Sequence, residues 1–416
     1  MRILTVCYIY PPEVQPAGVM TRELAEYLAA RGHAPTVITG FPNHPHGVVF
    51  EGYRKRVRQW EQREPFGVLR VWHTTSPKRT TLPRLAFYGS FALSSLLNGL
   101  SCGGQDVVFS LSSPVAGGLA CLLLARLKRA RFVYGVWDIY PETAVQAGVL
   151  RPGRLASWLR RVDTWVCRHA DRVVVLSEGF RGLLADRGIP PEKIEVLPIW
   201  IDAEEVRPLP RMNRWREKQG IDEHTFVVLY AGTIGLISGA QYVVETARLL
   251  QDQDILFLFV GEGLVKDEIT QRAADLGLRN MRFLPFAPRE HLAEVQATAD
   301  VSLVTLLPGQ GRTSVPSKVL GYMAAARPVI AAVEDDSDTA EWLRAADCGL
   351  IVRPQDAQAL ADAIVRLQAD AALRPRLGEN GRRYLVAHHT KEAALGRYLQ
   401  LFSVLPTPPG GPVHAG

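Results

Sequence analysis

The sequence predicts an α/β fold of two tandem Rossmann-like domains, each built on a doubly wound parallel sheet. Its 416 residues exceed what one hydrophobic core usually holds, so two domains are expected. Short apolar runs typical of buried strands alternate with helical patterns over residues 1–198 and again over residues 212–372. Between the two series, residues 198–211 carry three prolines and are typical of a linker.

The strands of the first series are short runs rich in Val, Ile, Leu or Phe, bounded by turn residues. The helix expected at residues 20–31 precedes Gly32, which suits the left-handed cap that ends many helices. Strands are expected at residues 3–10, 36–39, 68–73, 107–111, 132–136, 172–176 and 193–197, and a further helix at 155–168.

The second series repeats the pattern. Strands are expected at residues 225–230, 256–260, 282–284, 301–307, 329–332 and 350–352, and helices at 240–250, 265–276 and 319–326. A helix at about 385–403 is expected to join the first domain, and residues 404–416 to form a flexible tail. Ligands of such sheets lie beyond the carboxyl ends of the strands, so the loops at those ends are the candidate sites.

Composition is that of an ordinary globular protein, with 47% hydrophobic and 22% charged residues. Five scattered cysteines without CxxC or metal-ligand spacing favour a reducing cytoplasm. The apolar start of the chain is short and ends at Pro11 and Pro12 without a cleavage site, so a signal peptide is not expected. No apolar run is long enough to predict a transmembrane helix.

The net positive charge of the chain is concentrated in its first half. Residues 1–200 hold 25 Lys and Arg against 15 Asp and Glu, whereas residues 201–416 hold 23 against 27. Such asymmetry suggests an anionic partner for the first domain. No nucleic-acid motif accompanies the charge, so nucleic acid is not expected as a partner.

A membrane surface fits the basic half better than nucleic acid does. Residues 85–100 are apolar, with Phe87, Tyr88 and Phe91 expected in the headgroup zone. The neighbouring bases are Lys78, Arg79 and Arg84. A buried core helix is the other interpretation of the same residues.

The segment from Arg312 to Lys318 predicts a phosphate site. It lies between an apolar run and a helix, and Pro316 suits the first helical position because its missing N–H would have no partner there. The first N–H groups of the helix and its dipole favour an anion, and Arg312, Ser314, Ser317 and Lys318 crowd the same point. A phosphate or diphosphate is the expected ligand of this segment. The alternative interpretation is an ordinary capped helix with a solvated lysine and no ligand.

Other strand-end loops also carry candidate residues. Gly18 follows the first strand and would let backbone approach a ligand closely, although it also fits a plain turn into a helix. Residues 137–142 combine two acids with two aromatics, a composition suited to sugar hydroxyls and pyranose faces; Asp138 as a helix cap is the competing account. In the second domain, Gly232, Gly261 and Gly263 follow strands.

Several motifs are missing from the sequence. Neither GxxxxGK[ST] nor a complete GxGxxG after the first strand is present, so a P-loop NTPase or a simple dinucleotide oxidoreductase is not supported. No HExxH or similar His/Cys cluster predicts a metal, and no cofactor is expected.

Taken in order, these motifs resemble one known family. They comprise Tyr10 to Glu13, Leu24 to His33, Trp137 to Glu142, Leu229 to Gly235, Phe259 to Gly263, and Ser314 to Ala325. The chain resembles a retaining glycosyltransferase of the GT-B class, family 4. Within it, the chain is similar to bacterial O-antigen, capsule and colanic-acid transferases of the fucosamine type.

The resemblance implies a nucleotide-sugar donor, usually UDP-linked, in the second domain, and an acceptor in the first, commonly a lipid-linked (polyprenyl-diphosphate) sugar at the inner membrane surface. It implies catalytic roles for Asp138 and Lys318 and a diphosphate site at Lys318 with Gly18 across a cleft. It also implies nucleoside contacts and sugar or acceptor contacts by a further set of residues. These are Gly232, Gly261, Glu262, Gly263 and Phe286 for the nucleoside, and Trp137, Tyr140 and Glu142 for the sugar or acceptor.

The chain departs from the family in two places. Gly321 stands where many relatives have a ribose-binding Glu, and Thr313 replaces its companion acid. Ile234 and Ser238 stand near positions where many relatives have Arg and Lys. A non-catalytic nucleotide-binding relative would fit the missing ribose-binding Glu and stays open as an alternative. A UDP-sugar 2-epimerase, which shares the two-domain architecture, is a second alternative, while the motifs favour a transferase.

Overall fold

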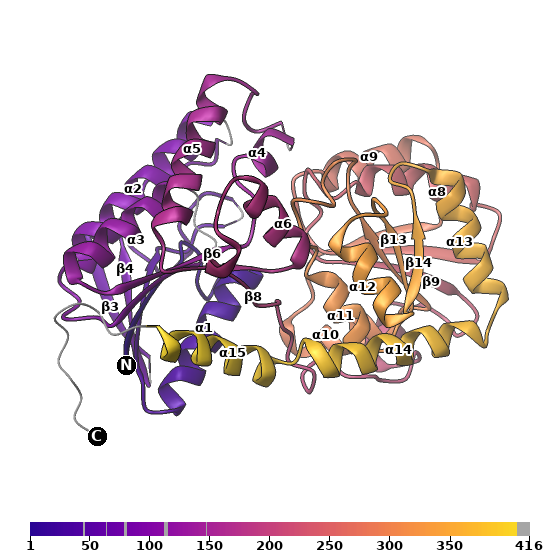
Figure 1. The fold of residues 1–416 in the computed structure, drawn as a ribbon. Coiled ribbons are helices and arrows are strands. Elements are labelled where there is room, and N and C mark those ends of the chain that lie inside the picture. The colour runs from indigo at the N-terminus through magenta and orange to yellow at the C-terminus, as the bar shows by residue number, and fades with distance from the viewer. Residues whose placement is uncertain (45, 64, 79–80, 112–114, 147, 406–416) are drawn as a thin grey trace. The chain divides into compact units, whose positions relative to one another are not determined.

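A computed structural model gives the fold of the chain (Figure 1) and describes residues 1–405 except 45, 64, 79–80, 112–114 and 147. The chain divides into two compact units, Met1–Leu197 with the segment from Leu395 on, and Pro198–Ala394. Each unit has its own sheet. The predicted α/β architecture of two doubly wound parallel sheets is confirmed.

An eight-stranded sheet forms the centre of the first unit, in the order β3-β4-β2-β1-β5-β6-β7-β8. β1 pairs in parallel with β2 and β5, and β5 with β6. Parallel strands end at the same edge of a sheet, so the segments after β1 and β6 leave it on one side. The strands are β1 (Arg2–Val6), β2 (Ala34–Gly40), β3 (Arg58–Arg63), β4 (Phe66–Val71), β5 (Val107–Leu111), β6 (Arg131–Val136), β7 (Arg172–Val175) and β8 (Ile194–Val196).

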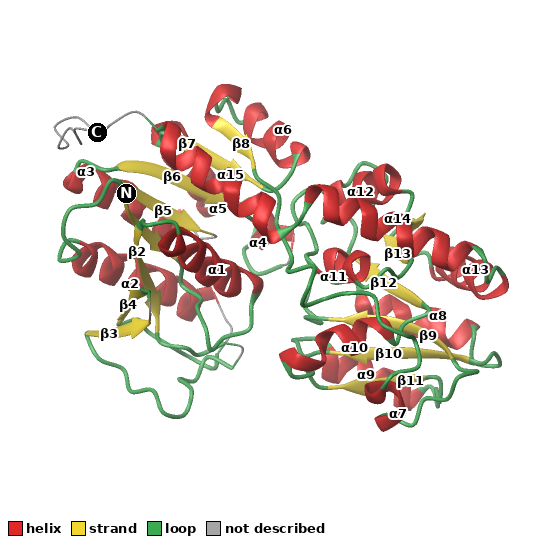
Figure 2. Cartoon of the chain, turned by 90° about the horizontal axis from the view of Figure 1, so that it is seen from below, coloured by secondary structure: helices red, strands yellow, loops and turns green. Residues whose placement is uncertain are grey.

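Helices cover both faces of this sheet (Figures 1 and 2). On one face, α2 (Thr81–Gly99), α3 (Val115–Lys128) and α5 (Arg154–His169) form a layer in which α3 contacts both neighbours. On the other, α1 (Pro16–Ala30) lies beside α15 (Lys391–Val404). The shorter α4 (Glu142–Gln146) and α6 (Glu178–Asp186) complete the unit. Gly32, at φ +77°, ends α1 as predicted.

One strand was missed by the sequence analysis. β3 pairs antiparallel with β4 along its whole length. Its sequence RQWEQR holds one apolar residue, Trp60, so it lacks the alternation that predicts a strand. The edge position explains this composition, because an edge strand is half solvated.

The predicted orientation of the α2 aromatics is wrong. The Phe87 ring lies 4.8 Å from that of His73, and Phe91 is 2% exposed, so both rings face the protein. The ring of Tyr88 packs edge-on against Tyr8, with centroids 5.7 Å apart. Arg79, predicted beside them, lies outside the described residues.

A six-stranded parallel sheet forms the second unit, in the order β11-β10-β9-β12-β13-β14. Its strands are β9 (Phe226–Ala231), β10 (Ile255–Val260), β11 (Met281–Leu284), β12 (Val301–Thr305), β13 (Val329–Ala332) and β14 (Gly349–Val352). Its helices are α7 (Arg214–Lys218), α8 (Val243–Leu249), α9 (Lys266–Asp275), α10 (Leu292–Ala297), α11 (Lys318–Ala324), α12 (Asp338–Ala346), α13 (Ala357–Ala369) and α14 (Leu373–His388).

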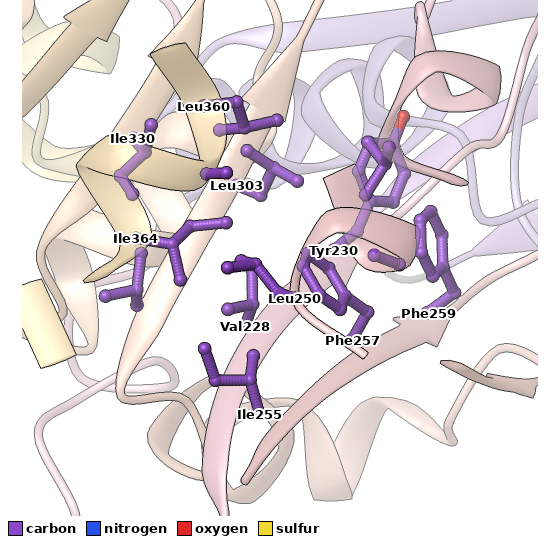
Figure 3. Close-up of a cluster of buried hydrophobic side chains, with 14 of the residues drawn as sticks. Val228, Tyr230, Leu250, Ile255, Phe257, Phe259, Leu303, Ile330, Leu360 and Ile364 are labelled. Carbon is purple, nitrogen blue, oxygen red and sulfur yellow. The ribbon is translucent and has the colours of Figure 1, made fainter. Parts of the chain in front are cut away.

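The core of this unit joins the sheet to α8 and α13 (Figure 3). Tyr230, Phe259 and Phe283 come from three neighbouring strands and stack in sequence, with ring centroids 5.2 and 5.0 Å apart. Strands buried on both faces have continuous apolar sequences, which is why β9 and β10 were predictable from sequence.

The proline-bearing segment 198–211 is packed rather than extended. It belongs to the second unit, where the Arg382 guanidinium of α14 donates to the carbonyls of Ala203 and Val206. The final helix is fixed to the first unit instead. The Phe109 ring of β5 meets Tyr398 and Phe402 of α15 at 5.8 and 5.5 Å.

Candidate functional site

Lys318 is the first residue of α11, at the carboxyl edge of the second sheet. Its Nζ lies 3.4 Å from the ring centroid of Tyr230 and 3.5 Å from the carbonyl oxygen of Thr233. Within the described part of the chain, no carboxylate forms an ion pair with it. Burial lowers the pKa of Lys318 well below its usual range. An ammonium held over an aromatic face without a counter-ion is a ready site for an anion.

The glycines after β9 and β10 have a structural reason that the sequence could not show. A Cβ on Gly261 would collide with the carbonyl of Gly232, and one on Gly263 with the carbonyl of Ile234. Gly232 has φ +126°, a conformation that side-chain-bearing residues rarely adopt, and a Cβ there would touch the Lys318 Cε. These glycines therefore bring the two loops together below Lys318; nucleoside contact by them stays a prediction.

The loop from β12 to α11 is organised by Glu334, a residue that the sequence analysis did not single out. Its carboxylate accepts hydrogen bonds from the backbone N–H groups of Gly309 and Gly311, the latter at 3.2 Å. Gly311 leaves no room for a Cβ beside that carboxylate. The carbonyl of buried Gln310 then accepts from the N–H of Ser314 at 3.0 Å. The fold thus sets the path of the chain toward Lys318.

The predicted diphosphate residues of this loop lie in different settings. Arg312 is exposed and paired with Asp336. Such a surface pair is weak, so the guanidinium can leave it for a ligand at little cost. Ser314 is half-buried, and Ser317 precedes Lys318 at the helix start without capping the helix through its side chain. The predicted place of Pro316 at the first helical position is wrong, because α11 begins two residues later.

Glu262 and Phe286 complete the predicted nucleoside set. The Glu262 carboxylate forms an ion pair with Lys266 at 2.7 Å. Phe286 follows β11 and is 42% exposed, so part of its aromatic side chain is open to a planar ligand.

The positions that depart from the family pattern serve the fold. Ile234 is fully buried in the core of the second unit. The Ser238 hydroxyl donates to the carbonyl of Gly235 at 2.7 Å and closes a turn. Gly321 is buried in α11, where a Cβ would lie 3.1 Å from the Gln296 amide nitrogen. Thr313 is 5% exposed.

In the first unit, Gly18 lies in the first turn of α1. A Cβ there would come within 3.1 Å of the backbone of Tyr10, so the glycine allows close packing of helix on strand end. The loop between them is held by Glu13, whose carboxylate accepts the N–H groups of Asn43 and His44, each at 2.9 Å. That Gly18 faces a diphosphate, and Lys318, stays a prediction.

Asp138, just after β6, is exposed and surrounded by tyrosines. Burial raises the pKa of Tyr8, Tyr88 and Tyr140, and the negative charge of Asp138 raises each further. The positive charge of Arg84 lowers the pKa of the last two. The surrounding protein also raises the pKa of Asp138 to about 7, although the side chain stays open to a ligand. Hydroxyls, aromatic edges and one carboxylate suit a polyhydroxylated ligand.

Tyr8 and Tyr88 were not predicted as site residues. Tyr8 fell inside an expected strand that ends earlier, at Val6, and Tyr88 was assigned to a membrane-facing surface. An aromatic residue just beyond a short strand was the available signal for Tyr8. Only packing places Tyr88 beside it.

Trp137 and Glu142, predicted to contact sugar or acceptor, are engaged by other parts of the protein. Trp137 is 8% exposed, so its ring faces are covered. The Glu142 carboxylate pairs with Arg187 at 2.5 Å and with Arg160 at 3.2 Å. The buried Asp163 holds the same Arg187 at 3.0 Å. A sugar contact by either residue stays a prediction.

In the described residues, no three His, Cys, Asp or Glu side chains are grouped closely enough to hold a metal ion. Over that same part of the chain, the helices are too short or too polar to cross a membrane.

Two family profiles match the chain in succession. The one described as "Glycosyl transferase 4-like domain" matches residues 17–200, and "Glycosyl transferases group 1" matches residues 211–384. The Escherichia coli K12 protein described as "Putative colanic acid biosynthesis glycosyl transferase WcaI" is 26% identical to this chain over 410 residues. The match covers 96% of this chain and 99% of WcaI.

Solved structures show the same fold at low sequence identity. Sucrose-phosphate synthase from Thermosynechococcus elongatus has a TM-score of 0.77 and 21% identity, covering 97% of this chain and 98% of that one. The Anabaena protein Alr3699/HepE, solved with UDP and glucose, has a TM-score of 0.71 and 16% identity. The match covers 97% of this chain and 99% of HepE.

Replacing Lys318 should separate stability from ligand binding. The lowered pKa means that the folded state disfavours the ammonium, which costs stability at every pH below the ordinary lysine pKa of about 10.4. Lys318→Met should therefore melt at the same temperature as the wild type or higher at pH 7, while the melting shift produced by UDP is lost. Lys218→Met, an exposed lysine of the same unit, is the control and should keep that shift. A normal UDP shift in Lys318→Met would refute the anion assignment.

Asp138→Asn should flatten the pH profile of the reaction rate. With a pKa of about 7, Asp138 gains its carboxylate charge as the pH rises from 6 to 8, so a rate that needs this charge rises across the same interval. We expect the variant to lose that rise and most of the rate. Because the raised pKa lowers stability as the pH rises from the ordinary Asp value of about 3.9, with the full cost reached above pH 7, the melting temperature of the variant at pH 8 should not fall. A large loss of stability with normal kinetics would instead identify Asp138 as a structural cap.

Glu334→Gln tests whether the loop from β12 to α11 positions the anion site. A glutamine amide offers one acceptor oxygen in place of two, so one of the two glycine N–H groups loses its partner, at a cost of about 1–3 kcal/mol. The loop should loosen, and UDP affinity should fall several-fold more than in the exposed control Glu341→Gln, measured by calorimetry. Unchanged affinity would show that the loop does not position the anion site.

Proposed function

Because the chain is a family 4-type glycosyltransferase with the GT-B fold, we propose that it moves a sugar from a UDP-linked donor to a lipid-linked acceptor with retention of anomeric configuration. The second unit binds the donor, and the first binds the acceptor. The transferred group is a hexosyl or N-acetylhexosaminyl residue. The observation that carries this proposal is the half-buried Lys318 ammonium without a carboxylate partner in the described residues.

Donor binding in this proposal centres on the edge of the second sheet. The diphosphate lies against Lys318, with Ser314, Ser317 and Arg312 as further donors. The base lies near Phe286, whose exposed ring supports stacking. The complex of Anabaena HepE with UDP, in a protein of the same fold, supports the choice of a uridine nucleotide.

The reaction is dominated by the leaving group. As the bond between the anomeric carbon and the diphosphate oxygen breaks, negative charge grows on that oxygen. Preorganised donors such as Lys318 are worth roughly 3 to 4 kcal/mol each at the transition state. A bond from the acceptor oxygen to the same carbon forms, and the acceptor proton passes to the departing diphosphate.

Asp138 acts on the sugar side. Its open carboxylate accepts a hydrogen bond from a sugar hydroxyl beside the reacting carbon, and Tyr8, Tyr88 and Tyr140 supply hydroxyls and ring edges around it. The raised pKa keeps this carboxylate sensitive to pH near neutrality. A paired-carboxylate mechanism, as in hydrolases, is not required.

The biological setting is the synthesis of a cell-surface polysaccharide such as O-antigen or capsule. The full-length match to WcaI, named for colanic acid biosynthesis, supports this setting. We propose that the enzyme works in the bacterial cytoplasm at the inner face of the cytoplasmic membrane. Its partners are the donor, a polyprenyl-diphosphate sugar and the membrane surface, without nucleic acid.

A UDP-sugar 2-epimerase and a non-catalytic relative are the alternatives. Neither is favoured, because both family profiles are those of glycosyl transferases. Loss of the ribose-binding Glu at Gly321 is the feature that a non-catalytic relative would share.

An acceptor-dependence assay should distinguish the three functions. The protein is incubated with UDP-hexoses and UDP-N-acetylhexosamines, with and without a polyprenyl-diphosphate sugar, and released UDP is measured. We expect release only with acceptor, and an α-linked product from an α-linked donor by NMR. Donor isomerisation without acceptor would identify an epimerase, and UDP-sugar binding without any turnover a non-catalytic protein.

A further inference from the structure

Helix α2 presents an apolar face to solvent along its whole length. Leu82, Leu93 and Leu97 are 76%, 58% and 59% exposed, and Leu85 is 42% exposed. Ala86 and Gly89 fill the same stripe, because these six residues recur at helical spacing. A helix on the surface of a soluble protein normally turns charged residues to water, and α2 turns none on this stripe.

The neighbouring helices extend this apolar face. On α3, Leu123 and Leu127 are 43% and 65% exposed. On α5, Trp158 and Trp165 are 57% and 45% exposed, one heptad apart on one side of the helix. Because α3 contacts both α2 and α5, the exposed residues of the three helices form one surface, which we call the leucine–tryptophan face. Apolar patches of this breadth mark interaction sites.

The exposed charge on these helices is positive. α2, α3 and α5 contain seven Lys or Arg and one acid, Asp163, which is 1% exposed and engaged with Arg187. Arg126, Arg154 and Arg161 are exposed, and no carboxylate of the described residues pairs with them. The leucine–tryptophan face is therefore bordered by free positive charge.

We propose that the leucine–tryptophan face docks on an anionic lipid surface. The charge decides between this occupant and a second copy of the chain. In a symmetric dimer the same face meets itself, so its arginines would oppose one another, whereas acidic headgroups neutralise them. The leucines of α2 and α3 enter the acyl boundary, and the tryptophans and arginines lie at headgroup level, as in interfacial helices.

The surface also places the membrane beside the candidate acceptor site. α2 turns Leu82 and Leu85 outward, while Tyr88 on the same stretch of helix packs against Tyr8 and lies near Asp138. A lipid-anchored acceptor could thus reach the Asp138 cluster from the bilayer on which α2 rests. This last consequence rests on the proposed function; the docking itself does not.

Vesicle flotation of the full-length chain tests the docking. Vesicles of phosphatidylglycerol and phosphatidylcholine are compared with phosphatidylcholine alone, at low and high salt. We expect wild-type protein to partition at least tenfold more strongly onto the anionic vesicles, and salt to weaken this binding. Recovery in the unbound fraction with every vesicle would overturn the proposal.

Matched variants assign the binding to this face. Leu93→Gln with Leu97→Gln should reduce partitioning at least tenfold, whereas Leu249→Gln with Leu276→Gln, exposed leucines of the second unit, should not. Arg126→Gln with Arg161→Gln should cost about fivefold for each base removed, and Arg279→Gln with Arg366→Gln should change little. Equal binding by the leucine pair and its control would refute the assignment.

Three further measurements complete the test. Brominated lipid should quench wild-type fluorescence, and Trp158→Phe with Trp165→Phe should remove most of that quenching. Light scattering should give the same mass for wild type and the α2 leucine variant; a dimer that this variant dissociates would show that a second copy covers the face. UDP release with a soluble sugar acceptor should be unchanged in the variant, so loss of docking and loss of transferase activity are distinguishable.

Discussion

The contact of Lys318 with the ring of Tyr230 links the core of the second unit to its chemistry. Tyr230 stacks on Phe259, and Phe259 on Phe283, so the ring under the ammonium is fixed by three strands of the sheet. Such a ring cannot move away from the charge, and it cannot neutralise it either. The fold therefore holds the Lys318 amine in place at the edge of the sheet, and because burial disfavours its ammonium form, an anionic ligand is what would stabilise the charge there.

The backbone around Lys318 is preorganised by close contacts and one carboxylate. Gly232, Gly261 and Gly263 let two loops pack directly against each other, and Glu334 ties down the loop that leads into α11. Glycines in strand-end loops suggested contact with a nucleotide, yet each has a packing reason of its own. Both readings are compatible, because loops that pack this closely also leave little side-chain bulk between backbone and ligand.

The first unit divides its helix α2 between two tasks. Its inner side packs Phe87, Tyr88 and Phe91 toward the protein, and its outer side exposes leucines. An apolar run of this kind is compatible with a core helix and with a membrane surface, and sequence analysis left both open. In the folded protein one side of the helix packs inward, and the other exposes leucines to solvent. The aromatics predicted for the headgroup zone face inward, and contact of α2 with a membrane stays a proposal.

The sequence by itself determined most of the strand order, because buried parallel strands such as β9 and β10 are unbroken apolar runs that local pattern identifies. It also indicated the loops at the strand ends, including Lys318 and Asp138. Only tertiary structure could place Tyr8 and Tyr88 beside Asp138, or Glu334 on the loop before α11, because these pairs are brought together by sheet order rather than by neighbouring positions. β3 was not predicted for a similar reason. Its polar sequence lacks a strand pattern, and it forms a strand by pairing with the edge of β4.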